Sequence, residues 1–153
     1  MVPRLFAGGN RIRTIGPALC ERGLWAVAGQ TDKLQQMVYA RGYDHNFVLN
    51  KPSGGGMAFA ARAYDARSGR MIDCFTTEPG VQIYTSNGMN GSLVGSSVST
   101  YRQTEGFTLE TQHFPDSPNK PNFPSTELKA GQEFRSTTLF RFATDASLPP
   151  LPR

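Results

Sequence analysis

Short runs of β-branched and aromatic residues, each bounded by glycine, proline, asparagine or aspartate, recur along the chain from about residue 38 onward. Such runs are typical of strands. The pattern predicts six strands, at 46–49, 57–64, 70–76, 81–86, 106–112 and 133–142. Turn-forming residues separate several of them, most clearly at 51–56, 65–69 and 87–91. Antiparallel strands joined in this way predict an all-β fold, a sandwich or a barrel, rather than a βα repeat.

Two of the predicted strands alternate clearly between apolar and polar positions. In the fifth, Phe107 and Leu109 point to one side and Glu110 to the other, because side chains alternate along a strand. In the fourth, Gln82 likewise lies opposite an aliphatic pair. The polar side chains therefore lie on the face away from the core. The pattern alone leaves open whether that face is merely solvated or binds a ligand.

The two ends of the chain differ from its middle. Residues 1–37 combine scattered glycines and prolines with neither a helical period nor an alternation, which predicts a poorly ordered segment. Residues 144–153 form a proline-rich tail. The part from 38 to 143 is expected to hold the fold.

Length and composition fit one globular domain. The chain has 153 residues, of which 38% are hydrophobic and 18% charged, enough for a real core. No apolar run approaches the roughly 18 residues that cross a bilayer, and the first residues do not resemble a secretory signal. We therefore expect no membrane partner and a cytoplasmic location.

The net charge of +4 does not indicate a nucleic-acid partner. Residues 1–41 hold six basic and two acidic residues, which accounts for the whole excess, so no basic surface is expected on the predicted strands. Cys20 and Cys74 are too few and too far apart for a zinc motif or a disulfide framework, so both are predicted to be free thiols. No metal site is expected.

Four segments, in order and spacing, closely resemble the C-terminal part of the aldose 1-epimerases, or galactose mutarotases. They are GYDHNFVLN at 42–50, SGR at 68–70, TTEPGVQIYTSN at 76–87 and GFTLETQHFPDSPNKPNFPST at 106–126. The resemblance runs from about residue 38 to residue 142. It implies an antiparallel β-sandwich of the galactose mutarotase type, with a sugar-binding cleft on one sheet.

The resemblance also implies a chemistry and its residues. Interconverting the α and β anomers of an aldohexose such as glucose or galactose needs a base for the anomeric hydroxyl and an acid for the ring oxygen. Glu110 in LETQ matches the family's general base, Asp44 in GYDHNF a carboxylate that binds sugar hydroxyls, and Gln82 in PGVQIY an amide near the reacting centre. The reaction requires no metal or organic cofactor.

The chain also departs from the family. Family members are about twice as long, and their general acid lies in a segment resembling H-x-Y-F-N-L, which is absent here. Neither His45 nor His113 has such neighbours, and strand alternation indicates that His45 packs, or supports a neighbouring side chain of the site, rather than binding a ligand itself. Two hypotheses follow. One is a piece of an aldose 1-epimerase that lacks the acid and that associates through exposed sheet edges, and the alternative is a noncatalytic carbohydrate-binding β-sandwich remnant.

Overall fold

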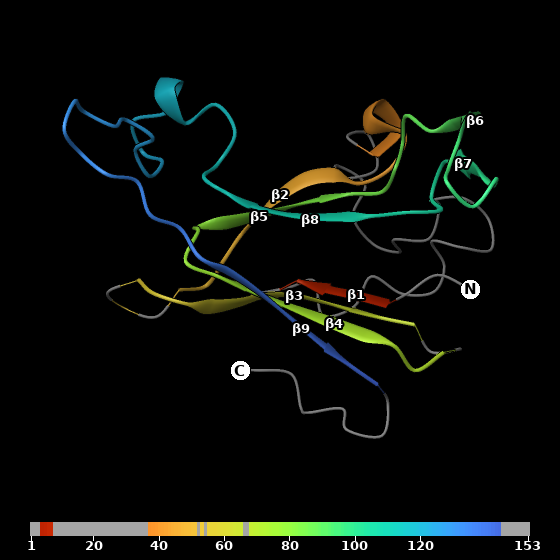
Figure 1. Ribbon diagram of the computed structural model, residues 1–153. Helices are drawn as coiled ribbons and strands as arrows, with labels where there is room; N and C mark the ends of the chain where they lie inside the picture. Colours follow the sequence, from red (N-terminus) through yellow and green to blue (C-terminus); the bar gives the residue numbers. More distant parts are fainter. Residues whose placement is uncertain (1–3, 8–36, 52, 54, 66–67, 145–153) are drawn as a thin grey trace.

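Two antiparallel sheets face each other and form the body of the molecule (Figure 1). The computed structural model describes residues 4–7, 37–51, 53, 55–65 and 68–144. One sheet has the order β1-β3-β4-β9 and contains β1 (Arg4–Ala7), β3 (Ala58–Tyr64), β4 (Met71–Thr76) and β9 (Thr138–Ala143). The other has the order β2-β5-β8 and contains β2 (Asp44–Val48), β5 (Gly80–Tyr84) and β8 (Thr108–Gln112). The predicted all-β sandwich is confirmed.

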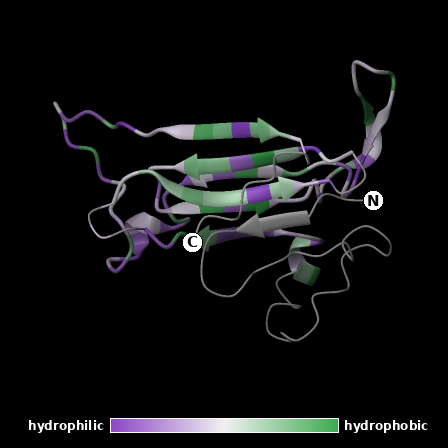
Figure 2. Ribbon diagram, turned by 90° about the horizontal axis from the view of Figure 1, so that it is seen from below, coloured by the Kyte–Doolittle hydropathy of each residue, from purple (hydrophilic) through white to green (hydrophobic). Residues whose placement is uncertain are grey.

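The core fills the space between the sheets. Val81 and Ile83 of β5 are fully buried and pack toward β3 and β4, whose contribution includes Ala61, Ala63 and Cys74. Alanines suit this position because they let the sheets approach closely. Hydrophilic and hydrophobic bands accordingly alternate along the strands in Figure 2. The predicted apolar faces of β5 and β8 are thus confirmed.

The structure adds strands that the sequence pattern does not predict. β1 pairs with β3, so the prediction of a poorly ordered N-terminal segment does not hold for Arg4–Ala7. Residues 1–3 and 8–36 lie outside the described part of the chain, as does the proline-rich tail from residue 145. β6 (Asn90–Val94) and β7 (Thr100–Arg102) form a two-stranded ribbon. These strands are short, and β6 begins in a turn signal, so their alternation is too brief to detect.

Helical structure is limited to short pieces within the described residues. A single helical turn covers residues 37–40, and a 3₁₀ turn, η1 (Ser117–Asn119), follows β8. No described helix has the length and apolar character needed to span a bilayer. Of the prolines after β8, Pro118 lies in η1, and Pro115, Pro121 and Pro124 lie in the loop around it.

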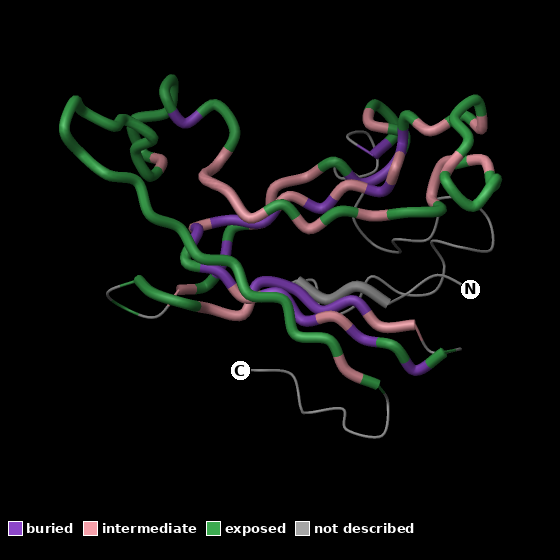
Figure 3. Tube along the Cα trace, in the orientation of Figure 1, coloured by how far each residue is buried: buried purple, intermediate pink, exposed green. Residues whose placement is uncertain are grey.

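Strand β9 is an exposed edge. It pairs with β4 from Met71↔Ala143 to Thr76↔Thr138 and has no partner on its other side among the described strands. Phe140 and Phe142 share the sheet face of the core residues that they oppose in β4, yet 44% and 75% of their surfaces are exposed. Figure 3 draws β9 as exposed along almost all of its length. An apolar strip therefore lies open at this border.

A buried ion cluster crosses the other face of the same sheet. Asp73 is fully buried and accepts hydrogen bonds from Arg62 Nε at 2.5 Å and Arg62 Nη2 at 2.9 Å, while Arg141 pairs with it from β9. Burial alone would raise the pKa of Asp73, but the hydrogen bonds and charges of the two arginines outweigh it and hold this pKa below its usual value. The cluster ties three neighbouring strands together.

Candidate functional site

The outer face of the three-stranded sheet is a lattice of polar side chains. Because alternate residues of β5 and β8 point into the core, those between them point outward. The strand register places these residues in rows across the sheet: Asp44, Tyr84 and Thr108; Asn46, Gln82 and Glu110; Val48, Gly80 and Gln112. Only valine and glycine among them lack a polar side chain.

The three residues singled out in the sequence lie together on this face. Gln82 pairs directly with Glu110 across β5 and β8, and Asp44 lies on the other side of Gln82, one row away. Gln82 Nε2 donates a hydrogen bond to Asp44 Oδ1 at 2.7 Å. Segments 66 residues apart in the chain thus contribute to one compact set.

The carboxylate of Glu110 is exposed and held by its own strand. Thr108, two residues earlier on the same face, donates from Oγ1 to Glu110 Oε1 at 2.6 Å. A carboxylate has further acceptor capacity beyond one such bond. Glu110 is therefore oriented and can still accept a proton or a hydrogen bond from a bound molecule.

The two histidines do not join this face. His45 is half-buried beside the core residue Tyr43, with ring centroids 5.9 Å apart in an edge arrangement. Burial lowers the pKa of His45, and the charge of Asp44 opposes that effect only in part. The prediction that His45 packs is confirmed.

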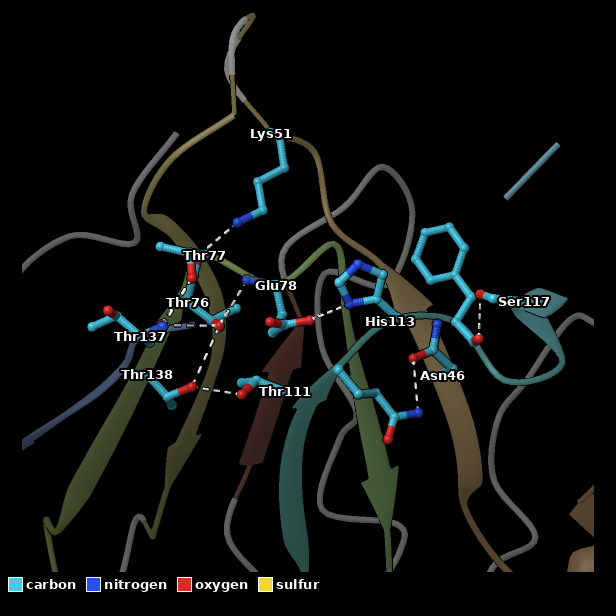
Figure 4. A network of polar contacts seen from close by, with 12 residues as sticks. Asn46, Lys51, Thr76, Thr77, Glu78, Thr111, His113, Ser117, Thr137 and Thr138 are labelled. Atoms are coloured by element: carbon cyan, nitrogen blue, oxygen red, sulfur yellow. Dashed lines mark hydrogen bonds and ion pairs between the residues drawn. The ribbon is translucent and has the colours of Figure 1, made fainter. Parts of the chain in front are cut away.

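His113 follows β8 and is paired with a buried carboxylate. Its Nδ1 lies 2.7 Å from Oε2 of Glu78 in the turn between β4 and β5 (Figure 4). Lys51, after β2, donates from Nζ to the backbone oxygen of Thr76 at 2.6 Å, beside this turn. Burial lowers the pKa of Lys51, and the nearby charge of Glu78 opposes the shift. These contacts join the ends of β2, β4 and β8.

Two further amides of the face were not assigned a role from sequence. Gln112 Nε2 lies 3.3 Å from Asn46 Oδ1 and 3.4 Å from Gln82 Oε1. Period-two alternation places Gln112 on the polar side, but the register that brings it beside Asn46 comes only from strand pairing.

Metal ligands do not gather in the described part of the chain. No group of three or more histidine, cysteine, aspartate or glutamate side chains there could hold a metal ion. Cys74 is a free, buried thiol, and burial raises its pKa to about 11. Cys20 lies outside the described residues. The chemistry of the polar face is thus that of carboxylates, amides and hydroxyls.

Comparison with known protein families identifies this arrangement. The family described as aldose 1-epimerase matches residues 24–141. The chain belongs to the aldose 1-epimerase family. The match begins upstream of residue 38, where the sequence motifs start, and it includes the whole polar face.

Individual relatives support the same assignment. The chain is 44% identical to the galactose mutarotase of Rattus norvegicus over 108 residues, covering 71% of this chain and 31% of that protein. It is 43% identical to the galactose mutarotase of Homo sapiens over the same length and shares of the two proteins. The aldose 1-epimerase of Escherichia coli (strain K12) is 33% identical over 107 residues, covering 69% and 30%. The chain thus spans about a third of the length of the curated relatives it matches.

A solved structure confirms the fold. The GalM/aldose epimerase homologue from C. elegans superposes with a TM-score of 0.56 at 20% identity, covering 67% of this chain and 30% of that one. The predicted antiparallel sandwich of the galactose mutarotase type is therefore correct for the aldose 1-epimerase portion present here.

Proposed function

We propose that the polar face binds an aldohexose and belongs to the catalytic cleft of an aldose 1-epimerase, an enzyme that interconverts sugar anomers. The observation that carries this proposal is the convergence of Asp44, Gln82 and Glu110 on one exposed sheet face. Sequence resemblance alone selects these three residues, and strand pairing independently brings them together. The proposal rests on that agreement together with family membership.

Glu110 acts as the general base. Its carboxylate is exposed and oriented by Thr108, so it can come within hydrogen-bond reach of an anomeric hydroxyl. Removing that proton opens the ring once the ring oxygen is protonated, and reclosure on the other carbonyl face gives the other anomer. Asp44 and Gln82 hold neighbouring hydroxyls, the first as an acceptor and the second through its amide.

The charge of the face favours a neutral sugar. Asp44 and Glu110 provide two carboxylates, and none of the outward residues of β2, β5 and β8 is basic. Carboxylates accept hydrogen bonds from hydroxyl groups but repel phosphate. An unmodified aldohexose therefore fits this face better than a sugar phosphate.

Neither histidine of the chain, both of which lie in the described part, is placed on this face to serve as the acid. The chain contains two histidines, and His45 packs beside Tyr43 while His113 pairs with Glu78. This observation favours a second function, in which the sandwich binds carbohydrate without catalysis. Both functions include sugar binding, and they differ in whether the chain accelerates mutarotation.

Sugar binding and catalysis are best measured separately. We expect the 153-residue chain to bind glucose or galactose weakly, seen as selective NMR shifts of Gln82 and its neighbours, and to give little acceleration of mutarotation in polarimetry. A missing general acid alone removes a factor of about 10² to 10⁴. The absence of any sugar-dependent shift would count against both functions.

The role of Glu110 needs a chain that has an acid. We expect activity when this chain is joined to the preceding part of a relative such as the rat galactose mutarotase, and Glu110→Gln should lower kcat of that chimaera by at least about 10²-fold. Glu127→Gln, the same substitution in an exposed loop, serves as the control. Equal kcat in both variants would remove Glu110 from the role of base.

A further inference from the structure

Side-chain amides on the polar face form a series of hydrogen bonds in which each amide donates to the next residue, from Gln112 through Gln82 to Asp44. The side-chain amide of Gln82 donates from Nε2 to Asp44 Oδ1. The side-chain amide of Gln112 donates from Nε2 to Gln82 Oε1 at 3.4 Å and to Asn46 Oδ1 at 3.3 Å. One amide nitrogen carries two N–H groups, so Gln112 can serve both acceptors at once. Both ends of the Gln82 amide therefore have partners.

Gly80 leaves the space that these hydrogen-bonded side chains occupy. A Cβ atom at Gly80 would lie 2.8 Å from Oδ1 and 2.9 Å from Nδ2 of Asn46, and 3.1 Å from a ring carbon of Phe114. The backbone of Gly80 has no positive φ, so glycine is used here for space rather than for conformation. Asn46 can thus lean across β5 toward the amide of Gln112 on β8.

The direction of these hydrogen bonds determines where the NH₂ group and the oxygen of the Gln82 amide point. If its amide turned over, the carbonyl oxygen would face the carboxylate of Asp44 and the NH₂ group would face the donor Gln112, so both contacts would become repulsive. Gln112 and Asp44 therefore act on opposite ends of the same amide. Asn46 in turn accepts from Gln112 and holds it over the sheet.

We propose that Gln112, supported by Asn46, is a positioning residue that fixes the amide orientation of Gln82 for sugar binding. The sugar-binding part rests on the function proposed above, whereas the orientation of Gln82 can be measured without a sugar. Gln112 does not itself need to touch the ligand. Its effect passes through Gln82 and, from there, to the second carboxylate of the site, Asp44.

The decisive substitution is Gln112→Glu, which keeps the shape but replaces a donor by an acceptor. A carboxylate at position 112 should draw the NH₂ group of Gln82 away from Asp44. In the ¹⁵N-labelled chain, kept below the concentration at which light scattering detects association, we expect the Gln82 side-chain NH₂ signals to shift and to exchange with water about fivefold faster, the effect of losing one hydrogen bond. A Gln82→Met variant identifies those signals.

Two further variants separate charge from hydrogen bonding. Gln132→Glu adds the same charge in an exposed loop and should leave the Gln82 signals unchanged. Gln112→Met removes the donor without adding charge and should give a smaller shift in the same direction. Titration with galactose or glucose should show affinity about fivefold weaker for Gln112→Glu than for the parent chain.

The outcomes distinguish this inference from the proposed function. Unchanged Gln82 signals in Gln112→Glu would overturn the positioning role, whatever the sugar does. Shifted signals with unaltered sugar affinity would overturn it as well. If the signals shift but the parent chain binds neither sugar, the orientation of Gln82 by Gln112 is upheld and the proposed function fails.

Discussion

The two sheets of the sandwich both carry charged groups on their outer faces, but they use them differently. On the four-stranded sheet, Asp73 is fully buried and bound by arginines from both neighbouring strands. On the three-stranded sheet, Asp44 and Glu110 are exposed, and among the described residues each accepts one side-chain hydrogen bond, from Gln82 and Thr108 respectively. One face has its charges matched within the protein, and the other leaves acceptor capacity unused.

This difference separates stability from binding. A buried carboxylate with complete partners holds strands together, and removal of one partner leaves an uncompensated charge. An exposed carboxylate that is oriented but incompletely bonded contributes little to folding and can accept bonds from a ligand. The contrast thus gives a physical reason to look for the ligand on the β2-β5-β8 face rather than on the β1-β3-β4-β9 face.

The largest expected effect tests the four-stranded sheet. Asp73→Asn removes the buried carboxylate that pairs with Arg62, whose side chain is only 4% exposed, and with Arg141, so we expect the free energy of unfolding to fall by about 3–5 kcal/mol. Urea denaturation followed by circular dichroism measures this loss. Glu133→Gln, in an exposed ion pair with Arg135, should change stability by less than about 1 kcal/mol. Similar losses of unfolding free energy in the two variants would contradict the distinction between buried and exposed ion pairs.

Acid should also reduce the stability that the Asp73 ion cluster contributes, by less than the Asp73→Asn substitution does. The pKa of Asp73 in the folded chain lies below its ordinary value of 3.8, so its stabilising contribution is complete above that pH and is lost as the pH falls through the lower, folded value. We expect the urea midpoint of the parent chain to drop below pH 3.8, and the drop to be smaller in Asp73→Asn, which cannot titrate at this position. An identical acid response in both chains would assign the loss to other carboxyl groups.

The sequence predicts some features of these faces and not others. Alternation of Val81 and Ile83 with Gln82 shows which side chains of β5 leave the core, since a strand has a fixed period of two. The rows that bring Asp44, Gln82 and Glu110 together depend on register between distant segments, which no local pattern contains. Only the family resemblance linked these three residues before strand pairing did.

The buried ion cluster shows the same limit more strongly. Arg62 and Asp73 occupy the outward positions of two apolar strands, and a sequence reading takes such charges to be solvated. Their burial follows from the pairing of β3, β4 and β9. β1 was missed for a related reason: four residues bound to the free edge of β3 have too little pattern to be recognised.

An intermediate effect is expected at the open border of the four-stranded sheet. Phe142 lies on β9, which pairs only with β4 among the described strands, and 75% of its surface is exposed; such edges recruit other chains. We expect the parent chain to associate and Phe142→Lys to raise the dissociation constant about tenfold, because a charge on an edge strand opposes pairing. Sedimentation velocity over a concentration series measures this shift.

A matched control tests whether the edge is responsible. Val98 is 86% exposed in the turn between β6 and β7, so Val98→Lys makes the same kind of change away from β9. We expect its association to match that of the parent. If both lysine variants dissociate equally, net charge rather than the β9 edge governs association.

The smallest expected effect completes the contrast. Glu110→Gln should alter the free energy of unfolding by no more than about 0.5 kcal/mol, because the residue is exposed and its contact with Thr108 lies on the surface. The measurement uses the same urea titration as Asp73→Asn. A loss comparable with that variant would mean that the open face is built for stability rather than for a ligand.

The pairing of β9 with β4 has a consequence for the order of folding. Thr76 and Thr138, which pair and lie 3.4 Å apart through their hydroxyls, are separated by 62 residues, whereas Tyr64 and Met71 pair across a short hairpin. Closing the longer loop costs more chain entropy, so the β3-β4 hairpin is expected to form first. At synthesis rates of about 5–20 residues per second, β9 emerges several seconds after β4. Until then Asp73 lacks Arg141, and the free side of β4 is open to any other strand within reach.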